Sequence, residues 1–188
     1  MPILRPLALL HCTALLLAAQ SPVTLPNGVK VYENIAYDAH PETVMDIYRP
    51  VGAGPFPAAI IIHGGGWTSG NKAGMIGNWV SRYLAKGFVV ANVEYRLAAA
   101  APAPAAVEDA LKAANFFIDN AKKYNADPKR IVVTGGSAGG HLALMVGMTP
   151  KSANLGKPVK VAAVVNFYGI SDVDDQLHGP NERKYATT

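Results

Sequence analysis

The chain of 188 residues is long enough to bury the core of one domain without disulfide staples. Half of its residues are apolar and 16% are charged, a balance that excludes a disordered chain and favours a folded domain with a buried sheet. The formal net charge of +4 comes from lysines and arginines scattered along the whole sequence, so nucleic acid is not expected as a partner.

The first residues differ in character from the rest of the chain. Residues 1–5 carry one positive charge, residues 7–17 are mostly apolar, and the small residues that follow suit a cleavage site. This pattern predicts a secretory signal peptide over residues 1–19 and a secreted or periplasmic protein. A membrane anchor is the alternative, but the apolar stretch is too short to span a bilayer comfortably, so no stable membrane span is expected after cleavage. The only cysteine, Cys12, lies in this segment, so the cleaved chain would contain no disulfide and no thiolate metal site.

The remaining residues, 20–188, predict one domain that begins with strands. Two loosely alternating stretches, 29–37 and 44–50, predict an antiparallel pair at the edge of a sheet. The continuous apolar run "AAIIIH" at 58–63 predicts a central parallel strand, because only a strand covered on both faces is apolar at every position.

Helix and strand patterns then alternate along the chain. The apolar positions of residues 75–84 share one helical face, Gly87 suits the end of that helix, and "FVVANVEY" at 88–95 predicts a further strand. The segment "AAAAPAPAA" at 98–106 predicts a loop, and it leads into an amphipathic helix over 107–121.

Two more apolar runs, 131–134 and 161–169, predict buried strands, with a turn at 125–130 before the first and a helix between them. Strands that alternate with helices predict an α/β fold. We therefore expect an open, mostly parallel sheet with helices on both faces.

A single serine lies where the strand at 131–134 passes into a helix. Gly135, Ser137 and Gly139 match the pattern G-x-S-x-G in the strand-then-helix context that this motif requires. Such a turn forces the serine into a strained backbone conformation, and its small neighbours permit close packing. The hydroxyl would lie beside the positive end of the helix, where it can attack an acyl carbon. A phosphate-binding turn is also rich in glycine, so this motif alone leaves both interpretations open.

A second glycine-rich segment favours the nucleophile. "HGGGW", residues 63–67, directly follows the apolar run of the central strand. The backbone N–H groups of Gly65 and Gly66, together with that of Ala138, would form an oxyanion hole with three donors. Two motifs in this order and on these elements indicate a serine hydrolase.

From about residue 34 to residue 169 the chain resembles a known family. The ordered motifs are "DIYRP", "HGGGW", "VEYRLA", "AAVEDALKA", "DPKRIVVTGGSAGGHLA" and "NFYGISD". They are similar to the α/β-hydrolases of the hormone-sensitive-lipase-like carboxylesterase group, especially secreted bacterial esterases related to acetylxylan and feruloyl esterases. The resemblance implies an α/β-hydrolase fold, Ser137 as the nucleophile, and a His63 that orients the oxyanion loop and transfers no proton. It also implies cleavage of a short-chain or carbohydrate-linked ester through an acyl-enzyme, a mechanism that needs no metal or cofactor.

The catalytic acid and base are not identified in this chain. In the family they follow the nucleophile on later strands, so we expect residues 20–188 to hold the N-terminal two-thirds of the fold, with the last strands missing. His141 lies one turn along a helix that runs away from the site, which suits packing better than proton transfer. His178 could reach over Ser137 from a loop, although acid and base would then both come from one short loop.

The acidic cluster "SDVDD" at 171–175 raises the question of a metal site. It lacks the glycine and the distal glutamate of a calcium-binding loop, so we expect a solvated loop there.

Two other functions stay open at this point. A chain that keeps the nucleophile and the oxyanion hole without acid and base would be a noncatalytic fragment, and an arylformamide hydrolase would carry a comparable histidine-glycine-tryptophan loop. Without later partner strands, the apolar run at 161–167 would form an exposed edge that favours association. No oligomeric state follows from the sequence.

Overall fold

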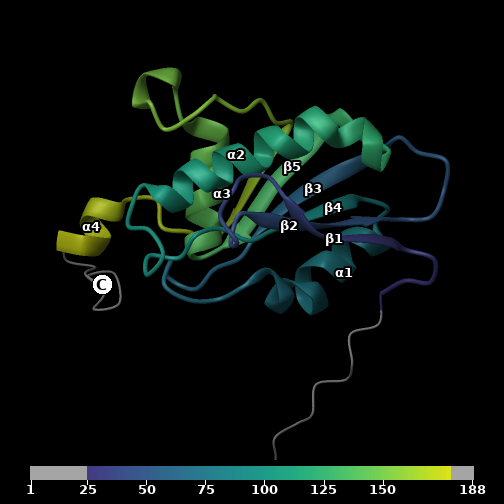
Figure 1. The fold of residues 1–188 in the computed structure, drawn as a ribbon, viewed down its shortest axis with the longest axis horizontal. Helices are drawn as coiled ribbons and strands as arrows, with labels where there is room; N and C mark the ends of the chain where they lie inside the picture. Colours follow the sequence, from purple (N-terminus) through teal and green to yellow (C-terminus); the bar gives the residue numbers. More distant parts are fainter. Residues whose placement is uncertain (1–24, 179–188) are drawn as a thin grey trace, which may run out of the picture.

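The computed structural model describes residues 25–178, and the predicted signal peptide at 1–19 lies outside the described residues. Six strands form one sheet in the order β1-β2-β4-β3-β5-β6 (Figure 1). They are β1 (Lys30–Ala36), β2 (Val44–Arg49), β3 (Phe56–Ile62), β4 (Val89–Val93), β5 (Ala126–Gly136) and β6 (Ala163–Phe167). β4, β3, β5 and β6 run parallel, while β2 is antiparallel to both of its neighbours. The predicted mostly parallel sheet with an antiparallel pair at one edge is confirmed.

Helices cover both faces of this sheet, as predicted (Figure 1). The α-helices are α1 (Ser81–Ala85), α2 (Ala105–Asn120), α3 (Ala138–Met148) and α4 (Val173–His178). Shorter helical turns are η1 (Lys72–Met75), η2 (Ile76–Val80), η3 (Ala121–Tyr124) and η4 (Lys151–Ala153). α2 and α3 pack on one face of the sheet, and the segment from η1 to α1 packs on the other. No helix of residues 25–178 is long and apolar enough to cross a membrane.

The central position of β3 explains its unbroken apolar sequence. Ala58, Ile60 and Ile62 lie in the core beneath α2 and α3, whereas Ala59 and Ile61 lie in the core on the α1 side. All five side chains are fully buried. Because successive side chains of a strand point to opposite faces, a strand with helices on both sides needs apolar residues at every position.

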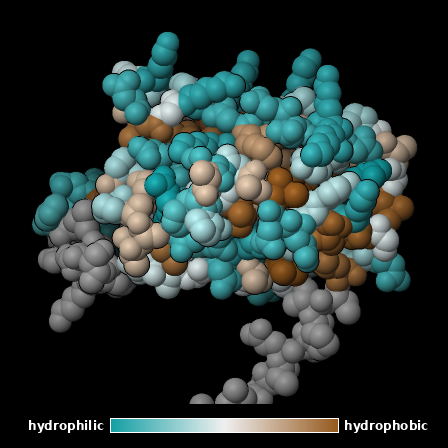
Figure 2. All heavy atoms as spheres, in the orientation of Figure 1, coloured by the Kyte–Doolittle hydropathy of each residue, from teal (hydrophilic) through white to brown (hydrophobic). Residues whose placement is uncertain are grey.

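α2 is amphipathic, as its sequence predicts. Ala110, Ala114 and Phe117 are fully buried against the sheet. On the outer surface, hydrophilic side chains gather over α2 (Figure 2). The alanine- and proline-rich residues before Ala105 form a loop, as expected.

The segment predicted as one helix over 75–84 is instead three short pieces, η1, η2 and α1. η1 has 3-10 geometry, η2 has π geometry, and only α1 is α-helical. Gly74 lies in η1 and Gly77 lies in η2, and glycine weakens a regular helix because it has no side chain to restrict the backbone. The predicted end at Gly87 is confirmed, since its φ is +78°.

Two local predictions toward the C-terminal part are wrong. The turn expected at 125–130 is mostly strand, because β5 already begins at Ala126. This part of β5 is irregular, and the Asp127 carboxylate accepts a hydrogen bond from the Lys129 N–H at 2.9 Å, a contact typical of turns. The acidic cluster at 171–175 is a loop only at Ser171 and Asp172, because α4 begins at Val173; the Asp172 carboxylate accepts a hydrogen bond from the Asp175 N–H at 3.0 Å.

β6 is exposed, so the prediction of a buried strand at this position is wrong for the described chain. It pairs with β5 on one side, and no strand of residues 25–178 pairs with its other side. Val165 is 37% exposed and Phe167 is 44% exposed. The alternative expectation, an exposed apolar edge, is confirmed among the described residues.

We expect this edge to cause self-association, because an unpaired strand without charged residues is a template for another chain. Val165→Lys should shift the chain toward the monomer in size-exclusion chromatography at several concentrations. Val31→Lys is the matched control: Val31 is also 37% exposed, but it lies on β1, where Lys30 and Glu33 already interrupt the apolar surface. A wild-type chain that stays monomeric at every concentration would contradict this prediction.

Candidate active site

Ser137 occupies the turn between β5 and α3. β5 ends at Gly136 and α3 begins at Ala138, so the chain passes from strand to helix through one residue. The backbone of Ser137 has φ 54° and ψ −124°, a conformation that residues with a side chain rarely adopt. Its N–H donates to the carbonyl oxygen of Phe167 at 3.0 Å, and its carbonyl accepts from the N–H of His141 at 3.0 Å. The strained serine turn that the motif predicts is confirmed.

Glycines allow this turn to pack against the end of β3. A Cβ atom on Gly139 would lie 2.1 Å from the carbonyl oxygen of Ile62, and one on Gly135 would lie 2.5 Å from the same oxygen. A Cβ on Gly64 would lie 2.7 Å from the carbonyl oxygen of Gly136. These distances are too short for any side chain, so the backbones of the two segments are in direct contact.

The loop after β3 is a tight turn with a left-handed backbone. Gly65, Gly66 and Trp67 have φ of 120°, 61° and 61°. The carbonyl of Gly65 accepts from the N–H groups of Thr68 at 3.1 Å and Ser69 at 3.0 Å. Among the described residues, no backbone oxygen accepts from the amides of Gly65 and Gly66. These two N–H groups are therefore available to a ligand.

Ala138 is the third predicted donor. It is the first residue of α3, so its N–H has no acceptor within the helix and lies at the positive end of the helix dipole. A Cβ on Gly64 would lie 3.5 Å from the Cβ of Ser137, which places the glycine loop beside the serine turn. The structure thus brings the two motifs together, and the roles of nucleophile and donors stay predictions.

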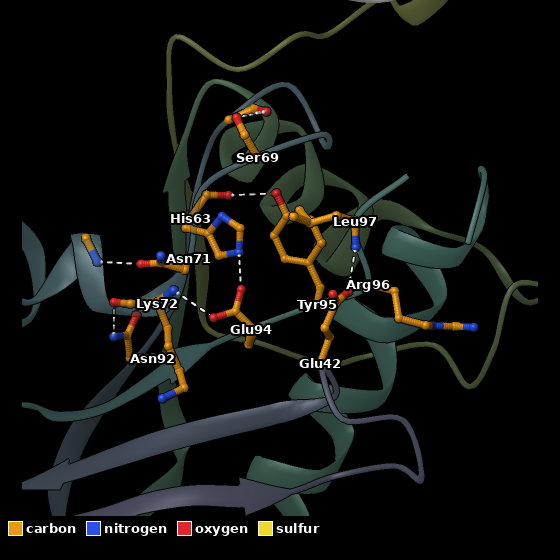
Figure 3. A network of polar contacts seen from close by, with 12 residues as sticks. Glu42, His63, Ser69, Asn71, Lys72, Asn92, Glu94, Tyr95, Arg96 and Leu97 are labelled. Atoms are coloured by element: carbon orange, nitrogen blue, oxygen red, sulfur yellow. Dashed lines mark hydrogen bonds and ion pairs between the residues drawn. The ribbon is translucent and has the colours of Figure 1, made fainter. Parts of the chain in front are cut away.

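His63 is buried beneath the glycine loop (Figure 3). Its Nε2 lies 2.9 Å from Oε1 of Glu94, and its Nδ1 donates to the carbonyl of Gly64 at 2.8 Å. The ring stacks on Tyr95 with a centroid distance of 4.3 Å, and the Tyr95 hydroxyl donates to the His63 carbonyl at 3.1 Å. Both ring nitrogens have partners away from Ser137, an arrangement that suits a residue that orients the loop.

Glu94 connects the loop to a wider polar network (Figure 3). Its Oε2 accepts from the N–H of Lys72 at 3.0 Å. The Lys72 ammonium is 2.7 Å from the carboxylate of Asp46, and Asn92 donates to the Lys72 carbonyl at 2.7 Å. Asp46 belongs to the motif "DIYRP" and Glu94 to "VEYRLA", and the sequence alone indicates no role for either carboxylate. In the structure both hold the residues around the loop, Glu94 through His63 and Lys72 and Asp46 through Lys72.

A second ion pair fixes the segment that follows β4. Arg96 contacts Asp109 of α2 through Nε at 2.8 Å and through Nη2 at 2.7 Å, and its backbone N–H donates to the same carboxylate at 3.0 Å. Asp109 is fully buried, and these hydrogen bonds raise the pKa of the Arg96 guanidinium. The pair ties the start of the alanine-rich loop to the first turns of α2.

The structure does not bring a base to Ser137 among the described residues. His141 packs edge-to-face on Trp67 at 5.3 Å, and its Nδ1 is buried without a hydrogen-bond partner in the described chain. His178 is exposed on α4, where its Nδ1 lies 3.1 Å from Asp174. Neither ring is hydrogen-bonded to the serine, so the role of His178 stays a prediction.

A cavity of about 510 Å³ lies next to the glycine loop. Gly66 and Trp67 line it on the loop side, and His141 lines it from α3. Most of the remaining wall comes from the alanine- and proline-rich loop and the first turn of α2. The other lining residues are Ala98, Ala99, 101–104, Ala106, Val107, Thr68, Arg96 and Val173. Ser137 itself is not part of the lining, so the cavity is adjacent to the reacting position and does not enclose it.

We expect Glu94→Ala to lower the free energy of unfolding by about 2 to 4 kcal/mol, because the side chain of His63 and the amide of Lys72 would both lose a largely buried partner. Urea denaturation followed by circular dichroism measures this change. Glu33→Ala, on the exposed surface of β1, is the control and should change the free energy by less than about 0.5 kcal/mol. Equal effects of the two substitutions would show that the network adds nothing to stability.

The burial of His141 predicts a pH dependence of stability. Burial lowers its pKa below the ordinary value of 6.5, so the unfolded chain binds more protons than the folded chain just below that pH. The free energy of unfolding should therefore decrease as the pH falls from about 7 to about 5. His141→Gln should show a smaller decrease in urea titrations at each pH. The same slope in both proteins would rule out a contribution from His141.

Comparisons with known proteins agree with this geometry. The chain is 31% identical over 150 residues to the esterase LipC of Mycobacterium tuberculosis, a match that covers 76% of this chain and 37% of LipC. It spans about a third of the length of LipC and of other curated relatives that it matches.

Two solved structures are similar in fold and sequence. A truncated carbohydrate esterase from gut microbiota superposes with a TM-score of 0.70 at 28% identity, over 82% of this chain and 60% of that chain. An α/β hydrolase enzyme from the metagenome of Lake Arreo in Spain superposes with a TM-score of 0.64 at 28% identity, over 79% of this chain and 47% of that chain. The sequence profile of the BD-FAE family matches residues 45–187. With its mostly parallel sheet, its serine turn and this match over more than half of its length, the chain belongs to the BD-FAE family of α/β hydrolases.

Proposed function

We propose that this chain carries the nucleophile and the oxyanion hole of a carboxylic ester hydrolase that forms an acyl-enzyme on Ser137. The observation that carries the proposal is the strained serine turn in backbone contact with a loop whose Gly65 and Gly66 amides have no backbone acceptor among the described residues. Several relatives are named as carboxylic ester hydrolases or esterases, which supports the same reaction class.

The proposed reaction follows from the direction in which charge moves. The Ser137 oxygen attacks the carbonyl carbon of the ester, and negative charge develops on the carbonyl oxygen. The amides of Gly65, Gly66 and Ala138 donate hydrogen bonds to that oxygen, and each such donor contributes about a hundredfold or more to the rate. Loss of the alcohol leaves an acyl group on Ser137, and water then releases the acid.

The attack requires a base that accepts the hydroxyl proton. His63 does not serve, because Glu94 and Gly64 occupy both of its ring nitrogens. No hydrogen bond joins a described histidine to Ser137, so the proposal includes a base that reaches the serine when the ester is bound. Within this sequence the candidate is His178, whose Nδ1 lies 3.1 Å from Asp174 in this structure.

The substrate class of this proposal is a short-chain or carbohydrate-linked ester. One similar structure is a carbohydrate esterase, and the family match covers most of the domain. None of these steps calls for a metal ion or a cofactor, because the backbone amides and the helix dipole stabilise the charge that develops.

A specific observation also favours a second candidate, a chain that is noncatalytic by itself. No base contacts Ser137 among the described residues: His178 pairs with Asp174, and His141 packs on Trp67. A serine without a base is a weak nucleophile, so such a chain would bind esters without turning them over.

We expect Ser137→Ala to lower the hydrolysis of p-nitrophenyl acetate by about a thousandfold or more and to abolish the acetylated species in intact-protein mass spectrometry. Ser152→Ala is the matched control, because Ser152 is exposed on η4 and should be neutral. Acetylation that persists in Ser137→Ala would refute the assignment. Absence of turnover and of acetylation in the unaltered chain would favour the noncatalytic candidate.

A further inference from the structure

We propose that the cavity beside Ser137 holds an uncharged, apolar substituent of the ester, and that the alanine- and proline-rich residues that line it, Ala98, Ala99 and residues 101–104, set the size of the group accepted. This inference rests on the proposed function. The shared chemistry is an alkyl or aryl group, which either the acyl side or the alcohol side of the ester can supply.

The position of the cavity relates it to the reacting atoms. Gly66 contributes both a proposed oxyanion donor and a part of the cavity wall, and His141 reaches the wall from one helical turn beyond Ser137. An ester whose carbonyl oxygen lies at the Gly65 and Gly66 amides therefore has one substituent at the mouth of the cavity.

The wall selects against charge. Most of the lining is alanine, proline and valine, together with Trp67. Arg96 is the one lysine or arginine that lines the cavity, and its Nε and Nη2 are both engaged by the buried carboxylate of Asp109. Burial of His141 lowers its pKa, which keeps the ring neutral at neutral pH. A carboxylate or ammonium group in this cavity would lose its hydration against a wall that is mostly apolar and carries no free carboxylate or ammonium group, which is unfavourable.

The cavity wall is also hydrogen-bonded to the glycine loop that carries the proposed oxyanion donors. The carbonyl of Trp67 accepts from the N–H of Ala98 at 2.9 Å, and the Trp67 ring packs on His141. The residue that follows the proposed donor Gly66 is thus fastened to the segment that lines the cavity. A substituent that fills the cavity contacts the same short loop that holds the donors.

The volume of about 510 Å³ is larger than an acetyl group needs and lies within the range of small-molecule sites, about 300 to 1,000 Å³. Each methylene group that leaves water for such a wall is worth about fourfold in binding or in kcat/KM. Longer apolar substituents should therefore be preferred until the cavity is full.

The first test compares substrates and a variant that narrows the cavity. With p-nitrophenyl acetate and hexanoate for the acyl side, and methyl and hexyl acetate for the alcohol side, we expect kcat/KM to rise about tenfold or more with length in one series. Ala101→Phe should lower kcat/KM for the long ester of that series about tenfold or more and so remove the preference. Ala100→Phe is the matched control, since Ala100 is adjacent, exposed and outside the lining. If Ala101→Phe does not fold, Ala99→Phe tests the same wall from its exposed rim.

A binding measurement separates this inference from the proposed function. Trp67 and Trp79 are the only tryptophans, so Trp79→Phe leaves the emission of Trp67 alone. Butyrophenone, an uncharged ketone that cannot be hydrolysed, should quench this emission saturably, and Ala101→Phe should weaken its binding about tenfold or more while Ala100→Phe should not. Quenching without ester turnover would support the binding of an apolar group in the cavity and would contradict the catalytic proposal. Turnover without a length preference would contradict the proposal that the cavity holds the substituent. Quenching that the two variants change equally would contradict it as well.

Discussion

The site depends on one close approach between two backbone segments. The turn at Ser137 lies so near the end of β3 that a Cβ on Gly139 would meet the Ile62 carbonyl oxygen at 2.1 Å. This contact holds the serine at the carboxyl edge of the sheet and places the glycine loop beside it. The strained φ of 54° persists because strand, helix and loop all constrain the same residue.

Buried polar groups give that arrangement its rigidity. The loop after β3 contains three successive residues with positive φ, and such a backbone needs support from below. His63 provides this support through its contacts with Glu94 and Tyr95. Glu94 in turn accepts a hydrogen bond from the backbone N–H of Lys72. Each of these groups is hydrogen-bonded, which is the condition under which buried polar groups rigidify a site and do not weaken it. The donors of the proposed oxyanion hole thus stand on a fixed support.

The cavity and strand β6 differ in how well neighbouring segments cover them. The loop from β4 to α2 closes the cavity wall because Arg96 is anchored on Asp109. β6 has no comparable cover among the described residues, and Val165 and Phe167 remain partly exposed. In the described residues, the serine turn and the glycine loop are therefore firmly held, whereas one edge of the sheet stays open.

The sequence alone determined the alternation of strands and helices, the central position of the apolar run at 58–63, and the strained turn at Ser137. These features follow from local periodicity and from glycine spacing, which are properties of short segments. Tertiary structure decided the rest. Only packing could show that Glu94 braces His63, since the two residues lie 31 positions apart, or that a low-complexity loop lines a cavity. The same holds for β6, whose apolar sequence suits a buried strand, because burial depends on which neighbours cover a strand and not on its own residues.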